Sequence, residues 1–377
     1  MNTFLKTTVI VLGLGLISAH VNATAPYVRV GISDCQGDRE SMEDAHTIAR
    51  NKGTQAPNAF FALYDGHGGD QASAYAATHL QNFFFAHRNR GMSIPDSLIN
   101  AFHQTDTAIQ SSLGAGTTAV IAYIEGATAY IAWTGDSRAL IIRNNHLLLH
   151  TQDHKPDSPA ERARIEAAGG SVLLVRGEPR INGLPMSRAL GDKNFKRPTP
   201  GAIIATPEIL QFQLQRGDVI ILGCDGVWDT VDNNEAAQLV ADLKSPSNGA
   251  RRYSWQRTGG RPIPNANRSS GGDPDMLRLT RALRNEAYAR GSGDNISVMA
   301  IEYIQAPPAK IIPKKAVALI KKAAVAKKPA PYKKAMKKAV PPKKIVKKVV
   351  RKKVIAKRQR PKKRRHHANR KRLMTKK

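Results

Sequence analysis

Residues 27–303 predict an α+β domain in which largely antiparallel sheets are covered by helices. First, short stretches rich in Val, Ile, Tyr and Phe alternate with amphipathic stretches. Second, several strand candidates follow one another at hairpin spacing, as at Ile124-Glu125-Gly126-Ala127. Third, 41% of the chain is apolar, which is enough to bury a substantial core. These observations exclude full-length disorder and argue against a doubly wound parallel sheet.

Each strand candidate is rich in β-branched or aromatic residues and is bounded by Gly, Asp or Asn. In chain order the predicted strands are 27–33, 59–64, 117–124, 127–134, 139–143, 219–224 and 296–303. The predicted helices, read from amphipathic spacing, are 70–85, 97–112, 158–168, 234–243 and 274–289. Residues 245–273 are dominated by Ser, Gly, Pro, Asn and Arg, so we expect a flexible insertion there.

The first 23 residues are typical of an export signal. Lys6 precedes an apolar or glycine run over 9–17, and small residues that suit cleavage end at Ala23. That run is roughly half of the about 20 apolar residues that a transmembrane helix needs, so a retained anchor is the less favoured alternative. We therefore expect the mature protein to be exported, periplasmic or secreted, with a folded domain over 26–305 and no transmembrane segment after removal of the signal.

The two cysteines, Cys35 and Cys224, permit at most one disulfide and cannot supply a four-cysteine zinc site. We expect both to be small buried residues.

Acidic residues stand at the ends of predicted strands or beside glycine turns. The positions that share this feature are Glu43, Asp44, Asp65, Asp136, Asp225 and Asp294. Strands that end in carboxylates would gather negative charge at one end of the sheets, where the charges repel unless a cation lies among them. Oxygen ligands favour Mg²⁺ or Mn²⁺, allow Ca²⁺ and disfavour Zn²⁺. An isolated Asp-Gly pair is more often a β-turn, so the prediction rests on the whole set.

Eight motifs follow one another along the chain: Arg39-Glu40-Ser41-Met42-Glu43-Asp44, Tyr64-Asp65-Gly66-His67-Gly68-Gly69, Gly116-Thr117-Thr118-Ala119, Gly135-Asp136-Ser137-Arg138-Ala139, Asp153-His154-Lys155-Pro156, Ser187-Arg188-Ala189-Leu190-Gly191-Asp192, Cys224-Asp225-Gly226-Val227-Trp228-Asp229 and Gly293-Asp294-Asn295-Ile296. In this order they resemble the motifs of the metal-dependent protein phosphatases of the 2C type, and the resemblance covers roughly 28–301.

The resemblance implies two antiparallel sheets sandwiched between helices, with a two-metal centre of Mg²⁺ or Mn²⁺ at one end. By motif position, Asp65 would bridge the two ions. Glu43 and the backbone carbonyl of Gly66 would bind one ion, and Asp225 and Asp294 would bind the other. Asp44 would support a metal-bound water, and Asp136 with Asp225 would hold a third, weaker ion of the kind that some bacterial members carry.

Hydrolysis of a phosphate monoester needs charge neutralisation, a nucleophile and a proton for the leaving oxygen, and two metals supply the first two. Arg39 is expected to hold the phosphate with its guanidinium, and His67 to donate the proton. The alternatives are an ion pair of Arg39 with Asp38 or Glu40 and a turn role for His67, whereas His154 is expected to order a loop.

The C-terminal stretch carries the excess charge. The formal net charge is +30, and residues 303–377 hold 30 of the 59 Lys and Arg and none of the 29 Asp and Glu. We expect 306–377 to be a disordered arm that resembles linker-histone tails and binds nucleic acid or another polyanion without reading sequence. The residues expected to contact it are Lys343, Lys344, Lys347, Lys348, Lys352, Lys353, Lys362, Lys363, Arg364 and Arg365.

We thus predict a monomeric, exported phosphatase that acts on phosphoserine and phosphothreonine in proteins. The competing hypothesis is a catalytically silent nucleic-acid-binding protein with a phosphatase-like domain. Basic residues 357–365 also resemble a nuclear-import signal, so delivery to a host nucleus is a further alternative for the location.

Overall fold

The structure is a computed structural model of the 377-residue chain, and it describes residues 28–51, 58–112, 114–244 and 271–304. The predicted signal segment, the basic tail and residues 245–270 of the predicted insertion lie outside the described residues. In the part that is described, no helix combines the length and the apolar character that crossing a membrane requires.

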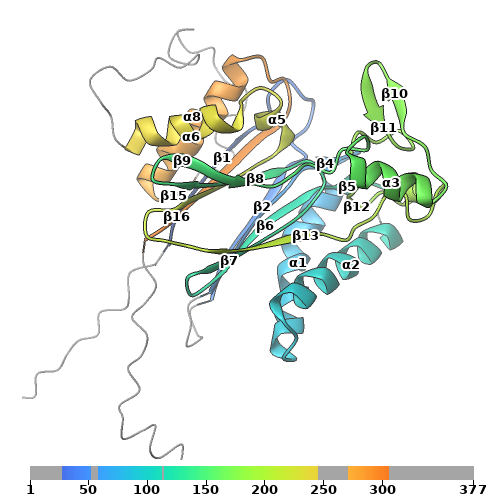
Figure 1. The fold of residues 1–377 in the computed structure, drawn as a ribbon, viewed down its shortest axis with the longest axis horizontal. Helices are drawn as coiled ribbons and strands as arrows, with labels where there is room; N and C mark the ends of the chain where they lie inside the picture. The colour runs from blue at the N-terminus through green and yellow to red at the C-terminus, as the bar shows by residue number, and fades with distance from the viewer. Residues whose placement is uncertain (1–27, 52–57, 113, 245–270, 305–377) are drawn as a thin grey trace, which may run out of the picture. The chain divides into compact units, whose positions relative to one another are not determined.

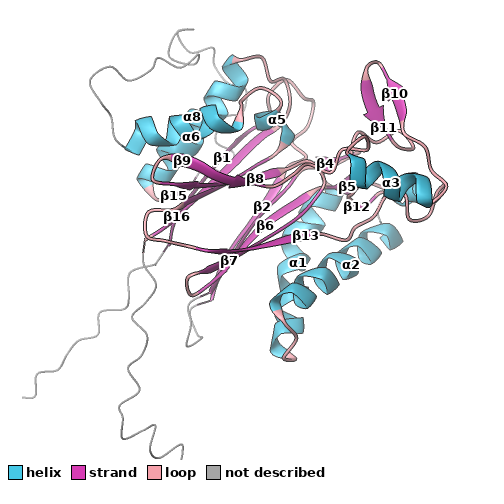
Figure 2. Ribbon diagram, viewed as in Figure 1, coloured by secondary structure: helices cyan, strands magenta, loops and turns pink. Residues whose placement is uncertain are grey.

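Two antiparallel sheets form the centre of the domain (Figures 1 and 2). The six-stranded sheet has the order β15 (Gly271–Gly272), β1 (Val28–Cys35), β16 (Ile296–Tyr303), β14 (Val219–Gly223), β8 (Arg138–Arg143), β9 (His146–His150). The five-stranded sheet has the order β13 (Glu208–Gln213), β7 (Thr128–Thr134), β6 (Ala119–Glu125), β3 (Asn58–Tyr64), β2 (Ala45–Asn51).

Helices cover the outer face of each sheet. On the five-stranded sheet lie α1 (Gln71–Asn89) and α2 (Ile94–Ser112), and on the six-stranded sheet lie α6 (Asn233–Lys244) and α8 (Pro274–Ala289) (Figure 1). Successive side chains of a strand point to opposite faces of the sheet, which explains the layers. Phe61 and Leu63 of β3 enter the core between the sheets, whereas Phe60 faces the helices. The predicted α-β-β-α sandwich is confirmed.

The helices form where apolar residues recur at helical spacing. In α1 the buried residues Ala72, Ala76, Leu80 and Phe84 follow one another every four residues and lie against the sheet. At the start of α8, the Asp273 carboxylate accepts hydrogen bonds from two backbone N–H groups of the first turn, at 3.1 and 3.4 Å.

Shorter elements surround one end of the sandwich. A small sheet joins β4 (Gly66–His67), β5 (Gly116–Thr117) and β12 (Leu190–Gly191), and a hairpin joins β10 (Leu173–Val175) and β11 (Glu178–Arg180). The short helices are α3 (Pro159–Ala167), α4 (Lys193–Lys196) and α5 (Asp225–Trp228). Together with its loops, α3 buries a small apolar cluster of its own that includes Ile165 and Ile203.

Three sequence predictions need correction. The predicted strand 117–124 is two strands, β5 and β6, because Thr118 between them turns its backbone N–H toward the Asp65 carbonyl at 2.8 Å. The predicted strand 219–224 ends at Gly223, and Asp225 begins α5. The predicted insertion 245–273 is too long, since Gly271–Gly272 pair with β1 and Asp273 caps α8.

Candidate metal centre

Five carboxylates reach one end of the sandwich from five different segments. Asp44 lies in the loop before β2, Asp65 follows β3, and Asp136 lies in the turn between β7 and β8. Asp225 is the first residue of α5, directly after Cys224, and Asp294 precedes β16. We call these residues, Asp44, Asp65, Asp136, Asp225 and Asp294, the acidic cluster.

The carboxylates of the acidic cluster are close enough to repel one another. Burial raises the pKa of Asp65 well above its ordinary value, and the negative charges of Asp225, Asp44, Asp136 and Asp294 raise it further. The pKa of Asp225 is raised by burial and then by Asp136 and Asp294. Burial, with a contribution from Asp294, raises the pKa of Asp44 to about 7. The structure therefore brings together residues that are distant in the sequence.

The donor set of the cluster fits a hard divalent cation. Neither oxygen of Asp44, and only one oxygen of Asp136, has a hydrogen-bond partner among the described residues, although all three unpartnered oxygens are buried. A carboxylate oxygen from Asp44 and one from Asp65 lie within 4.8 Å of each other and of Cys224 Sγ. A cation between the Asp44 and Asp65 carboxylates would replace the hydrogen bonds that Asp44 lacks and would remove the repulsion between the two groups.

Cys224 contributes packing and not a metal ligand. Its thiol donates to the Asn295 carbonyl at 3.3 Å and accepts from the Ser297 N–H at 3.2 Å. Burial and then the charges of Asp44 and Asp65 raise the pKa of the thiol, so it stays protonated, and metals bind the thiolate. Cys35 is likewise a buried free thiol, as the sequence predicted for both cysteines.

The glycines of the two Asp-Gly pairs allow backbone segments to approach closely. A Cβ at Gly66 would lie 2.4 Å from the Glu43 carbonyl oxygen, and a Cβ at Gly226 would lie 2.1 Å from the Asn295 carbonyl oxygen. Neither glycine has a positive φ, so an ordinary turn requirement does not explain them. They bring Asp65 toward the segment of Glu43, and Asp225 toward the segment of Asp294.

Asn295 ties the two ligand-bearing loops together. Its side-chain amide donates to the carbonyls of Gln36 and Ser41, at 2.8 and 2.9 Å, and its oxygen accepts from the Glu43 N–H at 2.8 Å. The Glu43 carboxylate accepts from the Ser41 hydroxyl at 2.9 Å and from the Gly69 N–H at 3.0 Å. Glu43 is thus fixed beside the cluster, with its oxygens partly engaged by the protein.

Arg39 is an ion-pair partner of the cluster itself. Its guanidinium lies 2.5 Å from an oxygen of Asp294, and 61% of the Arg39 side chain is exposed. The alternative pairing with Asp38 or Glu40 that the sequence allowed is not the one the structure forms. Arg39 is therefore at the rim of the cluster, where it faces solvent.

His67 is held by Asp192, a residue that the sequence analysis quoted in a motif but gave no role. Nε2 of His67 lies 2.9 and 2.8 Å from the two oxygens of Asp192, which is 1% exposed. The two residues meet because β4, β5 and β12 pair, which places the end of β12 beside His67. Burial lowers the pKa of His67, but the hydrogen bond and charge of Asp192 outweigh it and raise the pKa.

Lys155 is a second residue to which the sequence analysis gave no role. Its ammonium lies 2.5 Å from one oxygen of Asp136, whose side chain is 1% exposed. Burial alone would lower the pKa of Lys155, but Asp136 and Asp225 raise it. The neighbouring His154 accepts a hydrogen bond from the Gly135 N–H at 3.1 Å, and burial lowers its pKa to about 3, so it is neutral.

A second group of charges includes residues of α3, and its carboxylate is paired with guanidinium groups of the protein. The Glu161 carboxylate accepts hydrogen bonds from Arg188, Arg164 and Ser187 at 2.5–2.6 Å. Burial alone would raise the pKa of Glu161, but these three partners lower it to about 2. We call Glu161, Arg164, Ser187 and Arg188 the Glu161 cluster.

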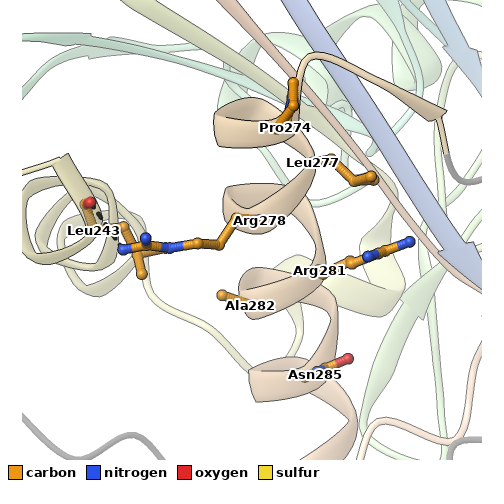
Figure 3. A pocket seen from close by; sticks show the side chains of 7 residues that line it. All are labelled: Leu243, Pro274, Leu277, Arg278, Arg281, Ala282 and Asn285. Atoms are coloured by element: carbon orange, nitrogen blue, oxygen red, sulfur yellow. Dashed lines mark hydrogen bonds between the residues drawn. The ribbon is translucent and has the colours of Figure 1, made fainter.

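A cavity of 550 Å³ lies apart from the acidic cluster, between α6 and α8. Figure 3 shows its lining, in which the Arg278 guanidinium donates to the Leu243 carbonyl at 3.1 Å. None of the predicted site residues lines this cavity. We do not assign the reaction to this cavity, because the described residues that line it include no carboxylate, histidine or thiol.

Comparisons with known proteins agree with the motifs. The sequence profile of the family described as Protein phosphatase 2C matches residues 28–296. "Probable protein phosphatase 2C 22" of Arabidopsis thaliana is 32% identical over 310 residues, which are 76% of this chain and 71% of that protein. "Protein phosphatase 1E" of Mus musculus is 35% identical over 287 residues, which are 73% of this chain and 34% of that protein.

A solved structure, "Structure of a C.elegans sex determining protein", superposes with a TM-score of 0.61 at 28% identity and covers 74% of this chain and 65% of that chain. The chain thus spans about a third of the mouse relative and about two thirds of the solved structure, and in each case the shared part is about three quarters of its own length.

Proposed function

Because this chain belongs to the protein phosphatase 2C family, we propose that it hydrolyses phosphoserine and phosphothreonine in proteins with Mg²⁺ or Mn²⁺ at the acidic cluster. Members of the family depend on these ions. The observation that supports the proposal most strongly is that burial and the charges of four other carboxylates, Asp225, Asp44, Asp136 and Asp294, raise the pKa of Asp65 well above its ordinary value.

The residues that would hold the ions are Glu43, Asp65, the carbonyl of Gly66, Asp225 and Asp294, with Asp44 behind them. Two divalent ions supply, when bound, a water of lowered pKa and neutralisation of the phosphoryl oxygens. We propose that two ions bind.

Arg39 binds the phosphate of the substrate. Its guanidinium is exposed and already makes one contact with a carboxylate, that of Asp294, and a phosphate could accept two hydrogen bonds from the guanidinium. When Arg39 pairs with the phosphate in place of Asp294, the Asp294 carboxylate is free to bind a metal ion.

His67 supplies the proton to the departing serine or threonine oxygen. Asp192 fixes Nε2 of the ring and stabilises the protonated form, which leaves Nδ1 for the transfer. No cysteine takes part, because both thiols are buried and the pKa of each is raised by burial.

Hydrolysis of a phosphoserine peptide by the full chain tests this function. We expect turnover with Mn²⁺, none after chelation, and none after Asp225→Asn. Turnover that is absent from the wild type in every metal would support the competing hypothesis of a catalytically silent binding protein.

For residues 306–377, which lie outside the described residues, we propose binding to nucleic acid through phosphates. The support is the charge of 30 Lys and Arg without one Asp or Glu. The logarithm of the binding constant for duplex DNA should fall with the logarithm of salt concentration, with a slope of about −0.9 per neutralised phosphate. A salt-independent interaction, or binding unchanged by alanine at Lys362, Lys363, Arg364 and Arg365, would contradict it.

We also propose export of the protein after cleavage behind Ala23, on the support of the apolar run 9–17. N-terminal sequencing of the mature protein should begin at Thr24, and an intact Met1 would contradict the proposal. Nuclear accumulation of a fluorescent fusion in host cells would instead support delivery to a host.

A further inference from the structure

Asp136 is the member of the acidic cluster that already has a cation from the protein. One of its oxygens lies 2.5 Å from Lys155 Nζ, and the other has no hydrogen-bond partner among the described residues. Since the Asp136 side chain is 1% exposed, solvent does not replace the missing partner. The Asp136 carboxylate is thus buried, with one oxygen against an ammonium group and the other oxygen without a partner. Its one negative charge is balanced by one positive charge.

The backbone holds Lys155 at this place. His154, its neighbour, exchanges two hydrogen bonds with Gly135, the neighbour of Asp136: His154 N–H donates to the Gly135 carbonyl at 3.0 Å, and Gly135 N–H donates to His154 Nδ1 at 3.1 Å. The His154 ring also stacks on Trp133, with centroids 5.9 Å apart. Lys155 therefore lies beside Asp136 for reasons independent of its own charge.

Other carboxylates near Lys155 do not compete for its ammonium. Asp153 is held by two hydrogen bonds from Arg138, at 2.9 and 2.7 Å. The positive charge of Lys155 also lowers the pKa of Asp225 and of Asp229, against the burial that raises both. Lys155 therefore acts on both residues, Asp136 and Asp225, that were expected to hold a third ion.

We propose that the Lys155 ammonium occupies the place of that third ion, so that Asp136 is neutralised by the protein and binds no metal while Lys155 is present. This inference rests on the proposed function, because it concerns the ion content of the same cluster. A divalent ion at Asp136 would lie close to the Lys155 ammonium, and like charges repel strongly in a buried site, so the ammonium disfavours the ion. Removal of the ammonium leaves Asp136 with two free oxygens and creates one additional site.

The test is the number of Mn²⁺ ions bound per full chain, measured by electron paramagnetic resonance of free Mn²⁺ during titration. We expect Lys155→Met to bind one more ion than the wild type. Lys155→Arg, which keeps the charge, and Lys193→Met, which makes the same change at an exposed lysine, should match the wild type. Equal numbers in the wild type and a folded Lys155→Met variant overturn the inference.

A second variant covers the case in which Lys155→Met does not fold. Asp136→Asn in the wild-type background should leave the number of bound ions unchanged, because Asp136 is paired with Lys155. A loss of one ion would show that Asp136 is a metal ligand and overturns the inference. A wild type that binds no Mn²⁺ would instead overturn the proposed function, so the two failures are distinguishable.

Discussion

The acidic cluster and the Glu161 cluster both bury several charges, but they are balanced in opposite ways. Glu161 meets two guanidinium groups and a hydroxyl, and its pKa is lowered to about 2. Asp65 meets four other carboxylates, and its pKa is raised by burial and by those charges. The charge of Glu161 is therefore balanced by groups of the protein, whereas the negative charges around Asp65 are balanced only when cations bind.

This difference indicates what each cluster does. Paired buried charges that connect α3 to the loop of Ser187 and Arg188 hold that part of the domain together. Unpaired buried carboxylates reduce the stability of the metal-free fold, and they persist where they serve binding or catalysis. Substitutions in the two clusters should thus have opposite effects on activity and on stability.

Substitution of the central carboxylate should abolish activity. We expect Asp65→Asn to lower phosphopeptide turnover by about a thousandfold, which is about 4 kcal/mol of lost transition-state stabilisation. The same variant without metal should unfold at a higher urea concentration than the wild type, because one repelling charge is gone. The exposed Asp157 is the matched control, and Asp157→Asn should change neither measurement. Full activity of Asp65→Asn would contradict the view that the acidic cluster serves catalysis and the Glu161 cluster serves stability.

Substitution of Glu161 should mainly reduce stability. Glu161→Gln leaves Arg164 without its carboxylate partner and leaves Arg188 only the exposed Glu208, at 3.1 Å. We expect a loss of about 3–5 kcal/mol in the free energy of unfolding, from urea denaturation at neutral pH. Glu166 forms only a surface pair with Arg162 at 3.8 Å, so Glu166→Gln should cost less than about 0.5 kcal/mol. Equal effects of the two substitutions would contradict the account.

The stabilisation by Glu161 should depend on pH in a definite direction. Its pKa is about 2 in the folded chain against the ordinary 4.5, so the stabilisation is present above pH 4.5 and is lost as the pH falls toward 2. The shift corresponds to about 3 kcal/mol. The difference in unfolding free energy between wild type and Glu161→Gln should accordingly shrink at low pH, and a constant difference would contradict the assignment.

Added metal should stabilise the fold through the acidic cluster alone. Mn²⁺ at 100 times its dissociation constant should raise the free energy of unfolding by about 2.7 kcal/mol for one site. Thermal unfolding with Mn²⁺ and after chelation measures this effect. Asp65→Asn should lose the response, Glu161→Gln should keep it, and a response of the same size in both variants would contradict the account.

The smallest effect is expected at Asp192. Asp192→Asn should lower turnover of a phosphoserine peptide by about tenfold, or about 1.4 kcal/mol, because His67 is less well oriented and less often protonated. An aryl phosphate, whose leaving group needs no proton, should be hydrolysed at nearly the wild-type rate. A uniform loss on both substrates would mean that Asp192 acts on the fold and not on the proton donor.

Most of the fold could be predicted because the buried strands have continuous apolar sequences. The predicted strand 296–303 and the predicted helix 274–289 have the same bounds as β16 and α8. The strands β2, β9 and β13 were missed because they lie at sheet edges or next to them and mix polar with apolar residues, as in the sequence EILQFQ of β13.

The acidic residues of the site could be predicted from their positions after strands, but their partners could not. The pairing of His67 with Asp192 spans 125 residues and depends on three strands of two residues each, which leave no periodic pattern. The ion pair of Arg39 with Asp294 spans 255 residues. The contact of Lys155 with Asp136 depends on the hydrogen bonds between His154 and Gly135. No sequence pattern predicts hydrogen bonds of this kind between two loops.

Anomalous scattering from crystals of the chain grown with Mn²⁺ is the most direct test of the acidic cluster. We predict manganese peaks in contact with the carboxylates of Asp65, Asp225 and Asp294, and none against Asp136. Crystals that diffract well and show no manganese beside Asp65 would contradict the view that these charges are buried in order to hold cations.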